Sequence, residues 1–132
     1  HVHLFIDQPD VLERLAPKAE RSPILVSQLD DDAAVGQNAD VIVCGFQVRL
    51  PQKARAALKD RPSGPPQLIQ LEYLSAEDWV ADGHGLPSLQ PDGLTEHFFN
   101  PGFSADTGGL LRERDLLQRR DAFLADPARR YQ

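Results

Sequence analysis

Glu72 occupies the position in this sequence that most suggests chemistry. Its carboxylate stands near the end of residues 67–74, which are predicted to form a buried strand. A carboxylate there is costly unless a cation or several N–H donors satisfy it. Ser75 and Asp78 follow with the spacing of a helix-start signature. A helix cap or an ion pair with a local arginine would also satisfy Glu72, and spacing alone slightly favours those roles over a ligand role.

Two histidines near the start of the chain form the other pattern with ligand spacing. His1 and His3 lie on one face of a predicted strand, and an H-x-H pair can bind zinc or another transition metal. A third ligand would have to come from His84 or His97. Surface histidines at an exposed edge are the commoner explanation of such a pair.

A cysteine and a glycine pair offer weaker signals. Cys44 has aliphatic neighbours that supply nothing to lower its pKa, which favours a small core residue over a nucleophile. Residues 107–111 place two glycines at a predicted helix start, where free N–H groups could bind an anion. A tight entry turn into the helix explains the same glycines and is favoured.

Alternating strand and helix patterns must position these residues. Residues 39–46 are almost continuously apolar, which is typical of a strand buried on both faces. We expect an α/β fold, a Rossmann-like parallel sheet with flanking helices. Ligands bind such sheets at the carboxyl ends of the strands, which directs attention to Asp7, Gly45 and Glu72. The expected strands are residues 1–6, 23–26, 39–46 and 67–74, with helices following Pro9, Pro51 and Ser75.

The final third of the chain is less regular. Residues 83–109 are rich in glycine and proline and carry a cluster of phenylalanines. The last segment is predicted to be helical, with apolar residues on one stripe. That stripe holds Leu110, Leu116, Leu117, Phe123 and Leu124.

Composition excludes several classes of protein. A length of 132 residues suits one domain, and a net charge of −6 argues against nucleic-acid binding by charge alone. No apolar run approaches the roughly 20 residues that span a bilayer, so no membrane association is expected. The single cysteine makes the cytoplasm the default compartment. The absence of methionine, even at position 1, leads us to expect a piece of a longer protein.

Four strings of residues together resemble one enzyme family. They are LEYLSAEDW (71–79), HGLPS (84–88), HFFNPGF (97–103) and TGGLLRERDLL (107–117). With VHLFID near the start and ADVIVCGF followed by Leu50 and Pro51, they resemble the bacterial elongation factor P arginine rhamnosyltransferases in the same order. The resemblance covers essentially the whole chain.

The resemblance implies a two-domain GT-B glycosyltransferase. Residues 1–132 would be a partial N-terminal, acceptor-binding Rossmann-like domain. The donor, TDP-rhamnose, would be held mainly by a C-terminal domain, and rhamnose would pass to an arginine of elongation factor P with inversion. The first strand and a D-N-x-G-D-x-G loop with the general base would precede His1. No cofactor or metal is implied, and this chain alone should not catalyse transfer.

The resemblance also assigns residues. Glu72 would hold the acceptor guanidinium, and Tyr73 and Ser75 would shape the acceptor pocket, although packing and helix capping explain the latter two equally well. A planar guanidinium fork matches paired carboxylate contacts, which the point charge of lysine cannot make. Two positions depart from the family pattern, because Cys44 stands where an acidic residue is usual and Asn100 where an aromatic is usual.

Other functions remain open from the sequence. One is a stand-alone, non-catalytic Rossmann-like binding module, and another is a GT-B transferase with a different donor or acceptor. A metal-dependent hydrolase built on His1 and His3 is the most distant alternative.

Overall fold

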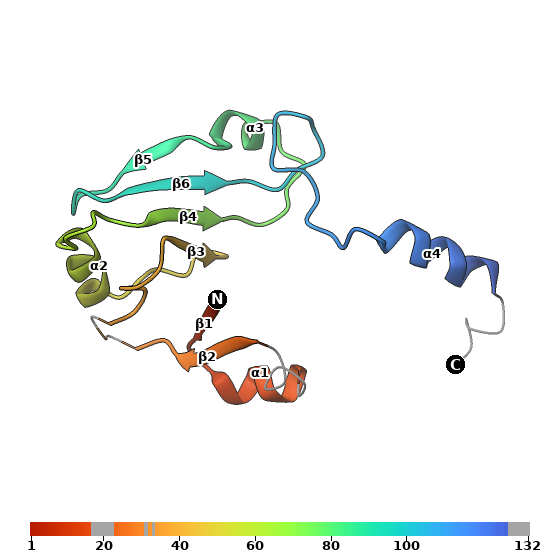
Figure 1. The fold of residues 1–132 in the computed structure, drawn as a ribbon. Coiled ribbons are helices and arrows are strands. Elements are labelled where there is room, and N and C mark those ends of the chain that lie inside the picture. Colours follow the sequence, from red (N-terminus) through yellow and green to blue (C-terminus); the bar gives the residue numbers. More distant parts are fainter. Residues whose placement is uncertain (17–22, 31, 33, 127–132) are drawn as a thin grey trace.

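Strands and helices alternate along most of the chain (Figure 1). The computed structural model describes residues 1–16, 23–30, 32 and 34–126. In chain order the elements are β1 (Val2–Ile6), α1 (Pro9–Leu15), β2 (Ile24–Gln28), β3 (Val41–Gly45), α2 (Gln52–Lys59), β4 (Gln67–Leu71), α3 (Trp79–Gly83), β5 (Pro87–Leu89), β6 (Thr95–Phe99) and α4 (Leu116–Ala125). The expected α/β fold with parallel strands and flanking helices is confirmed.

The strands form two sheets rather than the single layer predicted. β1 and β2 pair in parallel, and a second sheet has the order β3-β4-β6-β5. In the second sheet β3, β4 and β6 are parallel, and only β5 runs antiparallel. The carboxyl ends of β3, β4 and β6 therefore meet along one edge (Figure 1).

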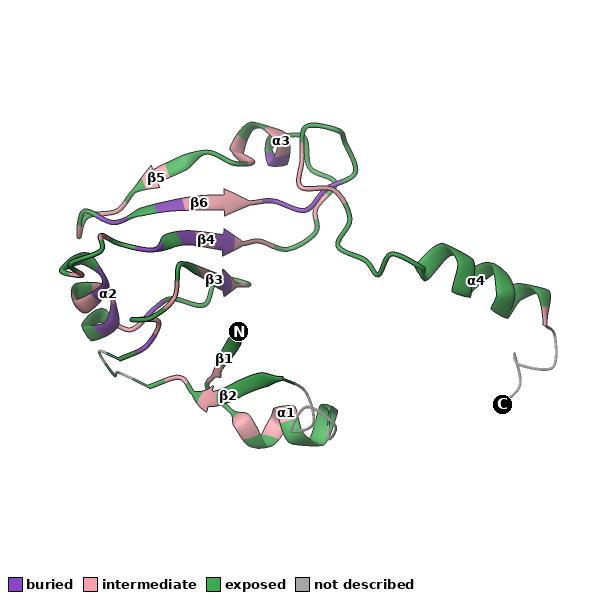
Figure 2. Ribbon diagram, in the orientation of Figure 1, coloured by how far each residue is buried: buried purple, intermediate pink, exposed green. Residues whose placement is uncertain are grey.

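The core lies between α2 and the four-stranded sheet. Ala54 and Leu58 of α2 are fully buried, and they belong to one cluster with Leu68 of β4 and Cys44 of β3. Figure 2 shows buried positions gathered on α2, β4 and β6. Gly36 is needed beside this core because its φ is +73° and a Cβ there would lie 2.5 Å from Ile42 Cδ1.

The prediction that β3 is buried on both faces is wrong. Cys44 points into the core, but Val41 and Val43 on the opposite face are 49% and 57% exposed. β3 is an edge strand of its sheet, and in the described part of the chain the face that carries Val41 and Val43 is only partly covered. In β1 it is Phe5, rather than the alternating Val2 and Leu4, that packs against the core cluster.

The irregular segment predicted at residues 83–109 in fact contains a hairpin. β5 and β6 pair antiparallel through Leu89 and Thr95, with Gly93 at a positive φ in the turn between them. The hairpin was missed because its first strand is only three residues long and begins at a proline. β6 then adds to β4 in parallel.

α4 stands apart from the sheets. It begins at Leu116 rather than at residue 110, and none of its residues is buried. Figures 1 and 2 show it extending away from the body of the molecule with its surface exposed. Among the described residues, no helix has the length and apolar character needed to cross a bilayer.

Candidate functional site

The segment after β4 lies along the carboxyl edge of the sheet and carries all three predicted site residues. Backbone hydrogen bonds fix its course. The Glu72 N–H donates to the Phe99 carbonyl at 3.0 Å, and the Ser75 N–H donates to the Pro101 carbonyl at 3.3 Å. The segment therefore runs beside the continuation of β6, and its position is set by the sheet.

Glu72 presents a half-buried carboxylate at this edge. Across the ranges that the structure describes, its side chain makes no hydrogen bond or ion pair. α3 begins only at Trp79, too far along the chain for Glu72 to cap it. The helix-cap and arginine-pair roles that spacing favoured are therefore wrong for the described residues, and the carboxylate is available to a ligand.

Tyr73 and Ser75 have different surroundings. The Tyr73 ring is exposed and lies against Phe46 with ring centroids 4.8 Å apart. Ser75 Oγ accepts a hydrogen bond from the Glu77 N–H at 3.1 Å, which closes a local turn. Asp78, not Ser75, occupies the N-cap position of α3, and it makes no side-chain cap. Ser75 therefore shapes the backbone after Glu72, and its predicted role in starting the helix is wrong.

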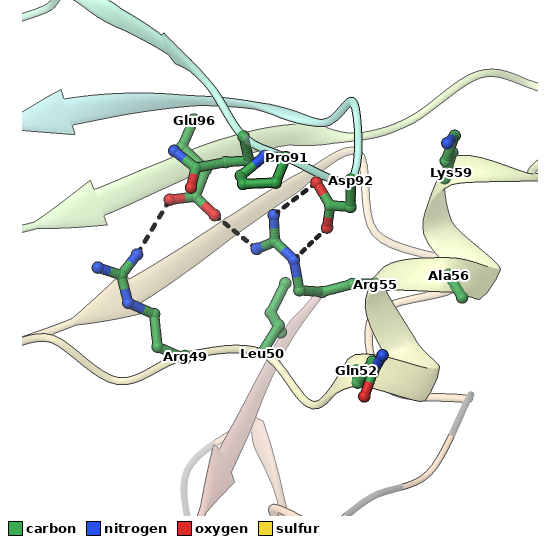
Figure 3. Close-up of a pocket in the computed structure, with 10 residues that line it drawn as sticks. Arg49, Leu50, Gln52, Arg55, Ala56, Lys59, Pro91, Asp92 and Glu96 are labelled. Atoms are coloured by element: carbon green, nitrogen blue, oxygen red, sulfur yellow. Dashed lines mark hydrogen bonds and ion pairs between the residues drawn. The ribbon is translucent and has the colours of Figure 1, made fainter.

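A second polar site, which the sequence did not predict, lies between α2 and the β5–β6 hairpin (Figure 3). It is an open groove of about 560 Å³. Arg55 extends from α2 and binds two acids at once: its Nη1 donates to Glu96 Oε1 at 2.5 Å, and its Nε and Nη2 donate to Asp92. Arg49 Nη1 and Gln70 Nε2 donate to Glu96 Oε2 at 3.3 and 3.2 Å.

Burial makes these contacts necessary. The Glu96 side chain is only 1% exposed, and a carboxylate without partners at such a position would be strongly destabilising. The hydrogen bonds from Arg55 hold the pKa of Asp92 below its usual value, and those to Asp92 and Glu96 raise the pKa of Arg55. The charges neutralise one another. Arg55, Asp92 and Glu96 therefore form a charged clamp that holds α2 to the hairpin.

Cys44 and Asn100, the two residues that depart from the expected family pattern, are both buried. Cys44 is part of the core cluster, as predicted, and burial raises the pKa of its thiol, with a further contribution from the Glu96 charge. Asn100 Nδ2 donates to the Val80 carbonyl at 3.2 Å, and its own carbonyl accepts from the Gly108 N–H. Asn100 thus connects α3 to the segment that precedes α4.

The glycines at 107–111 do not begin a helix, since α4 starts at Leu116. Gly108 instead packs against the Phe99 ring, where a Cβ would come within 2.6 Å of the ring carbons. The interpretation as an anion cradle at a helix start is therefore wrong. Gly108 allows a close approach to the end of β6, whereas Gly109 has a φ of +68° and nothing close to its Cβ position.

Two of the four histidines have local hydrogen-bond partners, whereas the buried Nδ1 of His97 has none in the described part of the chain. His3 Nε2 lies 2.8 Å from Ser27 Oγ, and His84 Nδ1 accepts a hydrogen bond from the Asn100 N–H. In the described part of the chain, no group of three or more His, Cys, Asp or Glu side chains is placed to hold a metal ion.

The sequence contained a signal for the charged clamp that could have been used. Glu96 falls between Leu94 and Phe98 in the alternating pattern of a strand, so it should share their buried face. A buried acid requires a basic partner. Without β6 in the prediction, the pattern could not be applied.

Comparison with known proteins decides the family. The model of the family described as Elongation-Factor P (EF-P) rhamnosyltransferase EarP matches residues 1–132. The chain belongs to the EarP family. The suspected resemblance is confirmed over the whole chain.

Curated EarP relatives are named protein-arginine rhamnosyltransferase. The relative from Pseudomonas aeruginosa is 41% identical over 133 residues, which cover 94% of this chain and 35% of that protein. The relative from Pseudomonas putida is 56% identical over 85 residues, covering 64% of this chain and 22% of that protein. The relative from Shewanella oneidensis is 45% identical over 96 residues, which cover 70% of this chain and 24% of that protein. The chain spans about a third or less of these relatives' length.

Replacing Arg55 by methionine should destabilise this EarP-family domain strongly. The change leaves the Glu96 carboxylate buried without its main partner, which costs about 3–5 kcal/mol. The loss in the free energy of unfolding is measured by urea unfolding of the full-length protein, followed through hydrogen exchange of the α2 and β6 amides. The double variant Arg55→Met/Glu96→Gln should recover part of it, because no uncompensated charge remains.

Arg49→Met is the matched control. Its side chain also contacts Glu96 but is 62% exposed, so its removal should cost less than about 1 kcal/mol. Equal effects of the Arg49 and Arg55 substitutions would show that the clamp does not depend on burial.

Acid should weaken the same clamp through Asp92. Since the pKa of Asp92 is lowered in the folded state, the unfolded chain takes up protons first as the pH falls. The stabilisation is therefore complete above the unfolded pKa of about 3.9 and is lost as the pH falls towards the folded pKa. The free energy of unfolding, measured at a series of pH values below about 5, should fall less steeply with decreasing pH for Asp92→Asn than for the unaltered protein. Identical slopes would contradict the assignment.

Proposed function

We propose that residues 1–132 are the acceptor-side, N-terminal part of an inverting glycosyltransferase with GT-B architecture. The reaction transfers rhamnose from TDP-rhamnose to an arginine of elongation factor P. In this proposal the donor is held mainly by a separate C-terminal domain, and the general base comes from an aspartate-bearing loop outside these residues. An enzyme acting on a translation factor would work in the cytoplasm.

The observation that carries the proposal is the free carboxylate of Glu72 in a chain of this family. It lies at the carboxyl edge of a parallel sheet, the usual place for ligands in α/β folds. The name of these relatives, protein-arginine rhamnosyltransferase, describes a reaction whose acceptor group is a cation. A carboxylate without a partner among the described residues suits that cation.

The chemistry explains why an acid is needed. The pKa of a guanidinium lies far above neutrality, so removing its proton at pH 7 costs roughly 7–9 kcal/mol. A carboxylate that binds the planar fork can orient it and concentrate its charge away from the attacking nitrogen. That nitrogen forms the bond to the anomeric carbon while the bond to TDP breaks, and the base outside these residues accepts the proton. Glu72 thus holds the acceptor but does not take its proton.

Tyr73 and Ser75 support this role from the same segment. Ser75 fixes the turn that follows Glu72 through its contact with the Glu77 N–H. Tyr73 is the next residue after Glu72 in the chain, and its ring is exposed. Both shape the place where the acceptor side chain would enter.

Glu72→Gln in the full-length protein should lower transfer to elongation factor P by roughly ten- to hundredfold, because one charge-assisted hydrogen bond to the acceptor becomes neutral. The intact mass of elongation factor P after incubation with TDP-rhamnose reports the added deoxyhexose. Glu77→Gln, an exposed acid in the same segment, should leave transfer unchanged.

The outcomes separate the parts of the proposal. If the unaltered enzyme adds no deoxyhexose, the assigned substrates are wrong. If it does and Glu72→Gln is equally active, Glu72 does not hold the acceptor.

A further inference from the structure

Two aromatic rings meet where β3 and β4 end. The last residues paired in the ladder are Gly45 and Leu71, and the Phe46 N–H extends it by donating to the Leu71 carbonyl at 2.8 Å. Phe46 and Tyr73 then bring their rings to a centroid distance of 4.8 Å with 31° between the planes. Both side chains remain more than half exposed, Phe46 at 52% and Tyr73 at 59%.

The backbone at Phe46 is unusual in a way that presents this ring. Phe46 and Gln47 have φ values of 56° and 67°, two consecutive non-glycine residues in the left-handed region. That conformation is unfavourable for residues with a Cβ and is found mostly where the surrounding structure enforces it. Here a tight turn enforces it, closed by the Val48 N–H donating to the Gly45 carbonyl at 3.1 Å. The turn holds the Phe46 ring against Tyr73 at the edge of the sheet instead of in the core.

The neighbouring charge indicates what the rings face. Glu72 lies in the chain between Leu71 and Tyr73, and the carbonyl of Leu71 accepts the hydrogen bond from the Phe46 N–H. The Glu72 carboxylate has no partner among the described residues. The faces of aromatic rings carry negative charge and attract cations, most often the planar guanidinium of arginine. A carboxylate on the residue next to Tyr73 in the chain, together with two exposed rings, therefore favours a planar cation and disfavours a phosphate group.

We propose that Phe46 and Tyr73 form an aromatic platform on which the guanidinium plane of the acceptor arginine stacks while Glu72 binds its N–H groups. The inference rests on the proposed function and adds Phe46 as an acceptor-binding residue. The platform selects arginine over lysine, because a flat delocalised cation stacks on a ring and a hydrated ammonium does so less well.

A double-mutant cycle on binding tests the platform without requiring turnover. The full-length enzyme and its Phe46→Leu variant are each titrated calorimetrically with elongation factor P and with elongation factor P whose acceptor arginine is replaced by methionine. Phe46→Leu should weaken binding of the arginine form by about two- to thirtyfold and leave the methionine form unchanged.

Two further variants serve as controls. Phe46→Tyr keeps a ring and should bind the arginine form like the unaltered enzyme, which separates stacking from a structural role of the turn. Phe103→Leu removes another exposed ring, 67% exposed, and should leave all affinities unchanged.

The contrary results are distinct. Equal weakening of both acceptor forms by Phe46→Leu would make the rings a general docking surface and overturn the proposal. A change in the affinity for TDP-rhamnose, with none for elongation factor P, would assign the rings to the donor and also overturn it. If the unaltered enzyme binds neither form of elongation factor P, the proposed function itself fails.

Discussion

The buried carboxylate of Glu96 is the constraint on which this structure depends. It lies in β6 with almost no access to water, and Arg55 reaches it from α2. Since a charge in that position is tolerated only with close partners, the contact with Arg55 ties α2 to β6. The apolar residues Ala54 and Leu58 fill the remaining space beneath the helix. The ion pair thus fixes where the helix sits, and the core provides most of the favourable energy.

Fixing α2 also fixes the edge at which chemistry is proposed. The turn that carries Phe46 connects the end of β3 to the start of α2, so both of its ends are anchored. On the other side of the edge, Glu72 and Ser75 are hydrogen-bonded to the continuation of β6. Glu96 is therefore fully paired within the fold, while the segment that carries Glu72 is fixed and the Glu72 carboxylate has no partner among the described residues. A site that binds a cation needs this division, because an acid already paired within the fold could not bind the acceptor as well.

Sequence patterns predicted the elements better than their surroundings. β1, α1, β2, β3, α2 and β4 follow from local periodicity and from helix and strand boundaries at Pro9 and Pro51. Periodicity could not show that β3 is an edge strand or that one of its faces is only partly covered, because both depend on tertiary packing, and Val41 and Val43 on that face are exposed. The motif predicted Glu72 as a site residue, and that role stays a prediction. Nothing in the sequence pointed to Phe46, since only the left-handed turn and the contact with Tyr73, both tertiary features, bring its ring to the proposed site.

Hydrogen exchange of the full-length enzyme, with and without elongation factor P, tests most directly where the acceptor binds. The amides of residues 46–48 and 72–75 should exchange more slowly in the complex, whereas those of the groove between α2 and the β5–β6 hairpin should not change. Protection confined to that groove, or to α4, with none at residues 46–48 and 72–75, would contradict the assignment of the carboxyl edge as the acceptor site.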